Sequence, residues 1–156
     1  MAYISGLDVV PTLEKMLEEG DHSHKVLYDF ICENWSKVED GYDLETLFDY
    51  LFQCRFYYSN KEEIEQELRK RLKKQVDAQG YITVYRGFNK NSREDGNSFT
   101  LSKDVAIYFS NRWGNDDGHV YKYKIKISRV MAFITDRNEA EIIADPDVVI
   151  LIEQIK

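Results

Sequence analysis

The chain is poor in the residue types that mark several special protein classes. Its 156 residues include only 2 Pro and 8 Gly, which excludes a collagen-like or low-complexity chain. Its two cysteines, Cys32 and Cys54, fall in helix-like stretches and do not have the spacing of a disulfide framework, and no set of cysteines and histidines has the spacing of metal ligands. We therefore expect a globular protein with free thiols in a reducing compartment and with no bound metal.

Long apolar runs and an excess of positive charge are missing too. No apolar stretch approaches the roughly 20 residues that span a bilayer, and the N-terminus lacks the basic residues and apolar run of a signal peptide. The formal net charge of -7 would repel nucleic-acid backbones and anionic membranes. The basic run at 69–74 ends a helix that opens with glutamates, an arrangement that suits the helix dipole. The sequence thus predicts a protein of the cytosol, bacterial or host, with no direct nucleic-acid partner and no membrane partner.

Hydrophobic periodicity divides the chain into two parts. A helical period near 3.6 runs through residues 11–19, 27–38, 44–52 and a segment from 59 or 60 to 72. A period of 2 predicts strands at 81–85, 98–101, 120–128, 140–144 and 148–155, interrupted by a helix at 103–113. We expect an α+β fold in a single domain, 1–156. In it, residues 1–80 form a helical layer packed on a small, mainly antiparallel sheet core formed by residues 81–156.

Two segments of the second part place polar groups at a predicted strand. Arg86 ends a predicted strand and precedes Gly87, so a guanidinium that can bind phosphate stands beside bare backbone. Ser98 and Thr100 alternate along the next predicted strand, which leads into a helix. Each signal is weak alone, because surface arginines and edge-strand hydroxyls are common.

A third segment contains Glu139 and Glu141. In an extended strand these two side chains would stand side by side on one face, and like charges so placed cost free energy. Folding alone gives little reason for the pair, although a solvent-facing edge strand with acidic residues remains an alternative explanation.

Taken in order, Arg86, the Ser98-x-Thr100 strand and Glu139-x-Glu141 resemble the R-S-E class of mono-ADP-ribosyltransferases, a family of many bacterial toxins and some phage enzymes. The resemblance covers residues 81–150. Phe109 stands where members of the family often stack a ring on nicotinamide, and Arg112 where a second arginine reaches the phosphates of NAD. The middle residue of the hydroxyl motif differs, since it is Phe99 here, and the interval from Arg86 to Ser98 is short.

The resemblance implies cleavage of NAD and transfer of ADP-ribose to a protein side chain, with arginine as the favoured acceptor. Glu141 would stabilise the oxocarbenium-like ribose, Ser98 would orient Glu141, and Glu139 would face the acceptor. The implied NAD-binding residues are Arg86, Gly87, Thr100, Phe109 and Arg112, and residues 133–138 would form a loop that recognises the target. Four tyrosines of the helical part are candidates for the adenosine side: Tyr42, Tyr50, Tyr57 and Tyr58.

Two other functions remain open from the sequence. A catalytically inactive binding or inhibitor module would keep this fold and use its helices to dock on a partner. An NAD glycohydrolase would have the same pocket and differ only at the acceptor face.

Overall fold

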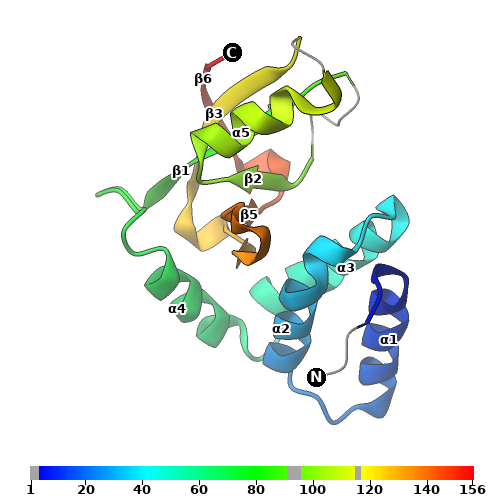
Figure 1. The fold of residues 1–156 in the computed structure, drawn as a ribbon. Helices are drawn as coiled ribbons and strands as arrows, with labels where there is room; N and C mark the ends of the chain where they lie inside the picture. The colour runs from blue at the N-terminus through cyan, green and yellow to red at the C-terminus, as the bar shows by residue number, and fades with distance from the viewer. Residues whose placement is uncertain (1–3, 91–95, 115–116) are drawn as a thin grey trace. The chain divides into compact units, whose positions relative to one another are not determined.

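The computed structural model describes residues 4–90, 96–114 and 117–156. This part of the chain contains five α-helices and a six-stranded antiparallel sheet (Figure 1). The chain divides into two compact units, residues 1–67 and 68–156. The α+β class expected from the two periodicities is confirmed. None of the helices in the described ranges has the length and hydropathy that a bilayer crossing requires.

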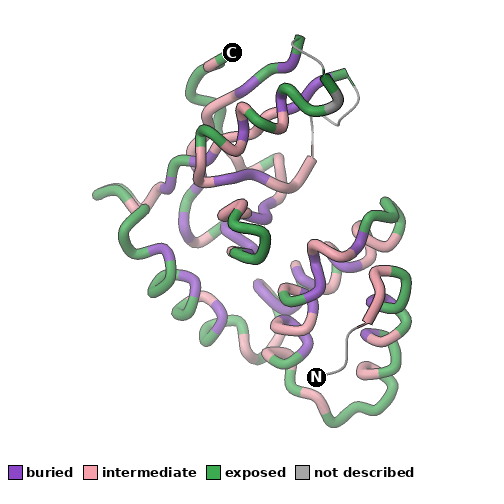
Figure 2. The backbone as a smooth tube through the Cα atoms, viewed as in Figure 1, coloured by how far each residue is buried: buried purple, intermediate pink, exposed green. Residues whose placement is uncertain are grey.

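The first unit is helical, as expected. It comprises α1 (Val9–Glu19), α2 (His24–Asn34), α3 (Gly41–Phe56) and the first part of α4 (Lys61–Arg71). Polar side chains cap the N-termini of α2 and α3. Ser23 accepts a hydrogen bond from the Val26 amide, and Asp40 accepts one from the Asp43 amide. α2 packs against both α1 and α3, and each contributes buried apolar residues to the core (Figure 2). The largest fully buried side chains of this core are Leu13, Ile31, Leu47, Leu51 and Ile64.

The second unit is built on a six-stranded sheet with the order β4-β5-β2-β1-β3-β6, in which every neighbouring pair is antiparallel. Its strands are β1 (Tyr81–Phe88), β2 (Ser98–Thr100), β3 (His119–Lys126), β4 (Ala132–Ile134), β5 (Glu141–Ile143) and β6 (Ile150–Gln154). One helix, α5 (Lys103–Ser110), packs on β1, β2 and β3. Ser102 caps the N-terminus of α5, where its side chain accepts a hydrogen bond from the Val105 amide.

Two glycines let α5 lie close to the sheet. A Cβ on Gly87 would stand 1.7 Å from the Ala106 carbonyl oxygen, and one on Gly118 would stand 1.9 Å from the Ser110 carbonyl oxygen. No other residue type fits at either position without moving the helix. The glycine at 87 therefore has a packing reason for its identity, independent of any ligand.

The structure corrects several predicted boundaries. β1 extends to Phe88, so Arg86 lies within the strand and not at its end. The helix expected at 103–113 ends at Ser110 and is followed by a 3-10 turn, η3 (Arg112–Gly114). The segment 133–138, predicted as a loop, is part strand and part 3-10 turn: Phe133 and Ile134 belong to β4, and η5 covers Asp136–Asn138. β4 was missed because three residues are too few to show a period.

Candidate active site

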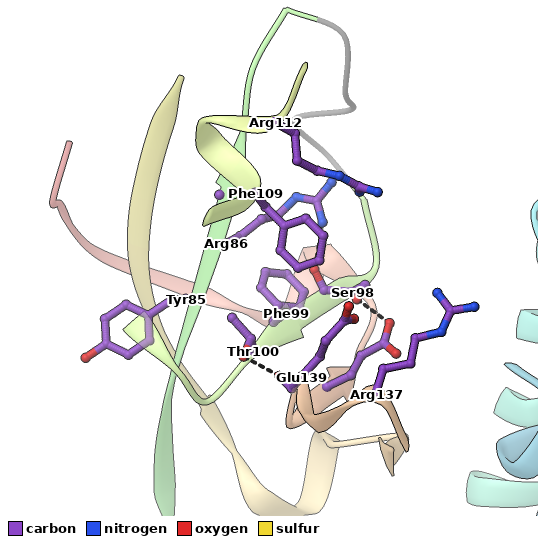
Figure 3. A pocket seen from close by; sticks show the side chains of 11 residues that line it. Tyr85, Arg86, Ser98, Phe99, Thr100, Phe109, Arg112, Arg137 and Glu139 are labelled. Carbon is purple, nitrogen blue, oxygen red and sulfur yellow. Dashed lines mark hydrogen bonds between the residues drawn. The ribbon is translucent and has the colours of Figure 1, made fainter. Parts of the chain in front are cut away.

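A pocket of about 270 Å³ in the second unit brings together all eight residues that the sequence singled out (Figure 3). They come from β1, β2, the α5–η3 segment, the turn before β5 and the first residue of β5. The pocket is lined by Tyr85, Arg86, Gly87, Ser98, Phe99, Thr100, Phe109, Arg112, Arg137, Glu139 and Glu141.

Ser98 holds Glu141 from the neighbouring strand. β2 and β5 are antiparallel, with Thr100 opposite Glu141 and Ser98 opposite Ile143. The Ser98 hydroxyl donates a hydrogen bond of 2.5 Å to a carboxylate oxygen of Glu141. A hydroxyl that donates to a carboxylate restricts the rotation of that carboxylate. Glu141 is thereby oriented at the wall of the pocket.

Thr100 acts on Glu139 in a different way, through the backbone. Its hydroxyl donates to the Glu139 carbonyl oxygen at 2.6 Å and accepts from the Ser102 amide at 3.0 Å. The side chain is buried, and its single O–H is used within the protein, so it has no donor left for a ligand. Thr100 therefore anchors the turn around Glu139, and the NAD-binding role that the resemblance implies for it stays a prediction.

The two glutamates do not lie in one extended strand, which corrects the sequence-based prediction. β5 begins at Glu141, and Ala140 has a φ of 47°, in the left-handed region. Arg137 and Asn138 also have positive φ values, of 65° and 57°. Each such residue costs roughly 1–2 kcal/mol, so the surrounding contacts must stabilise this turn. Both carboxylates line the pocket because of this bent turn and not because of strand alternation.

Arg86 reaches the pocket from β1 and is held by the chain that leads into β2. Its Nη1 atom donates to the Ser98 carbonyl oxygen at 2.7 Å. A Cβ on Gly96 would lie 2.4 Å from the Arg86 Nη2 atom, so the guanidinium packs directly against the Gly96 backbone. The Ser98 carbonyl oxygen and the Gly96 backbone, both in the segment that leads into β2, thus fix the position of the Arg86 guanidinium.

Phe109 and Arg112 line the pocket from the α5–η3 segment. The Arg112 guanidinium carbon lies 4.9 Å from the centroid of the Phe109 ring. Asn89, which is buried, donates through Nδ2 to the Arg112 carbonyl oxygen at 3.0 Å and so anchors the turn that presents this arginine. Asn89 was not predicted as a site residue, because a polar residue after a strand is typical of an ordinary turn.

Three further lining residues were not assigned a role from the sequence: Tyr85, Phe99 and Arg137. Phe99 is buried and packs edge to face against Tyr123, which explains the aromatic residue between the two hydroxyls of β2. Arg137 stands two residues before Glu139, so its proximity to the motif was the available signal. The four tyrosines proposed for the adenosine side belong to the first unit.

The pocket combines three guanidinium groups with two carboxylates, although the whole chain has a net charge of -7. Guanidinium groups bind phosphates in bidentate geometry, an aromatic ring stacks on a flat heterocycle, and an oriented carboxylate stabilises a developing positive charge. The arrangement therefore suits an anionic ligand with a flat ring and a reaction through a cationic transition state.

No family model, curated protein or solved structure matches the chain.

Proposed function

We propose that this protein is an NAD-dependent mono-ADP-ribosyltransferase of the R-S-E class, with the corresponding fold in its second unit and with arginine as the acceptor. The observation that supports this most is the Ser98–Glu141 hydrogen bond in a pocket that also contains Arg86 and Phe109. The motif residues are close together in space, in an arrangement that their proposed roles require.

NAD fits the chemistry of the pocket as a substrate. Arg86 and Arg112 would bind its pyrophosphate, and the Phe109 ring would stack on nicotinamide. The volume of about 270 Å³ lies near the lower end for ligand sites, so the pocket would enclose the nicotinamide-ribose end of the molecule.

Two carboxylates would divide the reaction between them. Glu141, oriented by Ser98, would stabilise positive charge on the ribose as neutral nicotinamide leaves. Glu139 would bind the incoming guanidinium and accept its proton as the nitrogen attacks the ribose. Release of nicotinamide then depends on Glu141, whereas transfer to arginine depends on both.

The test measures nicotinamide release beside transfer of label from NAD to agmatine, a small free guanidine. Glu141→Gln should abolish both reactions, and Glu139→Gln should retain slow release of nicotinamide while transfer fails. Glu153→Gln, an exposed position on β6 that does not line the pocket, is the matched control.

The result separates the competing functions. Nicotinamide release by the parent without any labelled acceptor indicates an NAD glycohydrolase. Absence of both reactions refutes the enzyme and favours a binding or inhibitor module. If Glu139→Gln labels agmatine as well as the parent does, the acceptor role of Glu139 is wrong.

A further inference from the structure

The end of α4 and the turn after it carry a dense positive charge. Two buried leucines, Leu68 and Leu72, anchor this stretch in the second unit. Five of the six residues at 69–74 are Lys or Arg, and all five are exposed: Arg69, Lys70, Arg71, Lys73 and Lys74. We call these five residues the basic segment.

The two units of the chain have net charges of opposite sign. Residues 1–67 contain 5 Lys and Arg against 16 Asp and Glu, a net charge of -11, whereas residues 68–156 contain 16 against 12, a net charge of +4. Two glutamates that precede the basic segment in α4, Glu65 and Glu67, pair with Arg55 and Lys25 of the first unit at 3.1 Å and 3.0 Å. The unit that contains the pocket is therefore basic, although the whole chain is acidic.

Arg71 attaches the basic segment to the sheet beside the pocket. Its Nη1 atom donates to the Phe133 carbonyl oxygen at 2.8 Å, and its guanidinium carbon lies 4.6 Å from the centroid of the Phe133 ring. Phe133 belongs to β4, an edge strand that pairs with β5. After β4 the chain enters the turn that bears Arg137 and Glu139, both of which line the pocket (Figure 3). The basic segment thus contacts the strand that leads directly to the proposed acceptor residue.

Resting on the proposed function, we propose that the basic segment binds the acceptor protein, and that this protein carries acidic side chains around the arginine that is modified. The carboxylates of the pocket attract the arginine itself, whereas the basic segment attracts the carboxylates that flank it. Complementary charges at the rim of an interface speed association and favour one partner over another. A local acidic patch on the acceptor is sufficient, because exposed charges interact over about 10 Å at 0.1 M salt.

A nucleic acid suits this surface less well than an acidic protein. It offers no arginine to Glu139, and the net charge of -7 on the chain repels an extended polyanion. A protein can place a few carboxylates near one arginine without extending over the acidic first unit. Charge complementarity therefore favours a protein with an acidic surface patch.

The experiment compares two synthetic peptides as acceptors for the purified full chain. Each peptide contains one arginine, flanked on both sides by glutamates in the first peptide and by glutamines in the second. The measurement is kcat/KM for transfer of label from NAD, beside agmatine labelling and nicotinamide release. At low ionic strength we expect the glutamate peptide to be preferred by about tenfold, and the preference should disappear at high ionic strength.

Two triple variants locate the effect. Replacement of Lys70, Lys73 and Lys74 with glutamine keeps the contact between Arg71 and Phe133. It should lower kcat/KM for the glutamate peptide by about tenfold and leave agmatine labelling and nicotinamide release unchanged.

The matched control removes the same charge from β3, which three strands separate from β4 in the sheet. It replaces Lys122, Lys124 and Lys126 with glutamine and should keep the preference for the glutamate peptide. Circular dichroism verifies the folding of both variants.

The possible failures are distinguishable. Equal labelling of the two peptides by a parent that modifies agmatine overturns this proposal and leaves the proposed function intact. Equal losses in the two triple variants overturn the role of the basic segment, because net charge alone would then explain the preference. Stronger inhibition by a DNA oligonucleotide than by an arginine-free glutamate peptide of equal charge would assign the segment to nucleic acid and overturn the acidic protein. A parent that releases no nicotinamide refutes the proposed function, and this proposal fails with it.

Discussion

Replacing Thr100 with valine should separate the two proposed reactions of the pocket. Valine has nearly the shape of threonine but lacks the hydroxyl. The substitution removes the bond that Thr100 donates to the Glu139 carbonyl oxygen and the one that it accepts from the Ser102 amide. The hydrogen bond from Ser98 to Glu141 stays in place.

The size of the effect follows from these contacts. Thr100 is 5% exposed and its partner residues Glu139 and Ser102 are half-buried, so the two partner groups lose hydrogen bonds where access to water is restricted. Each unsatisfied group costs about 1–3 kcal/mol, and we expect the free energy of unfolding to fall by about 2–3 kcal/mol. The turn that loses its anchor contains the left-handed residue Ala140, which relaxes toward commoner backbone conformations once the bond is gone.

The activity should respond unevenly. Transfer to agmatine should fall by about ten- to a hundredfold, because Glu139 loses its fixed position. Nicotinamide release should stay within about threefold of the parent, because Glu141 keeps its orientation. Initial rates of both reactions at saturating NAD, with circular dichroism to verify folding, measure the difference. The control is Thr83→Val, at an exposed position on β1. It should change the free energy of unfolding by no more than about 0.5 kcal/mol and should leave both rates unchanged.

Two results would refute this reasoning. Equal losses of transfer and of nicotinamide release in a folded Thr100→Val protein would mean that the turn supports the whole pocket and not Glu139 in particular. Full transfer activity would mean that the Thr100 hydroxyl does not position Glu139 at all.

Three further predictions test other parts of the structure. Gly96→Ala should displace the Arg86 guanidinium with little loss of stability, and calorimetry should show NAD binding weakened by about tenfold. Unchanged affinity would mean that Arg86 does not bind NAD. Ala140→Gly should raise the free energy of unfolding, measured by urea titration, by up to about 1 kcal/mol, because glycine adopts the left-handed conformation without strain. The control Ala106→Gly, at a buried position in α5, should lower the free energy of unfolding. A lower free energy of unfolding for Ala140→Gly would contradict strain at this residue. Burial raises the pKa of the Cys54 thiol to about 11, so iodoacetamide at pH 8 should modify it only after unfolding, and rapid native-state modification would count against its burial. Because the unfolded thiol ionises near pH 9.0, the same shift makes stability fall as pH rises from there toward 11.

Strong local signals in the sequence predict most helices and strands of this protein. The helices of the first unit and most strands of the second follow from periodicity, since a buried face repeats every 3.6 or 2 residues whatever surrounds it. The resemblance to a family motif also singled out eight residues that share one pocket. Five of them meet there because β1, β2 and β5 are neighbours in the sheet.

The way in which these residues are held depends on contacts that form only in the packed protein. Ala140 adopts a left-handed conformation that no local preference of alanine predicts, and bonds from β2 across the sheet stabilise it. The role of Gly87 in admitting α5, and the anchoring of Arg112 by Asn89, likewise depend on contacts between distant segments. A sequence pattern reports which side chains are available, but such contacts form only when the sheet and helix pack together, so the position of each group in the pocket is a property of the packed unit.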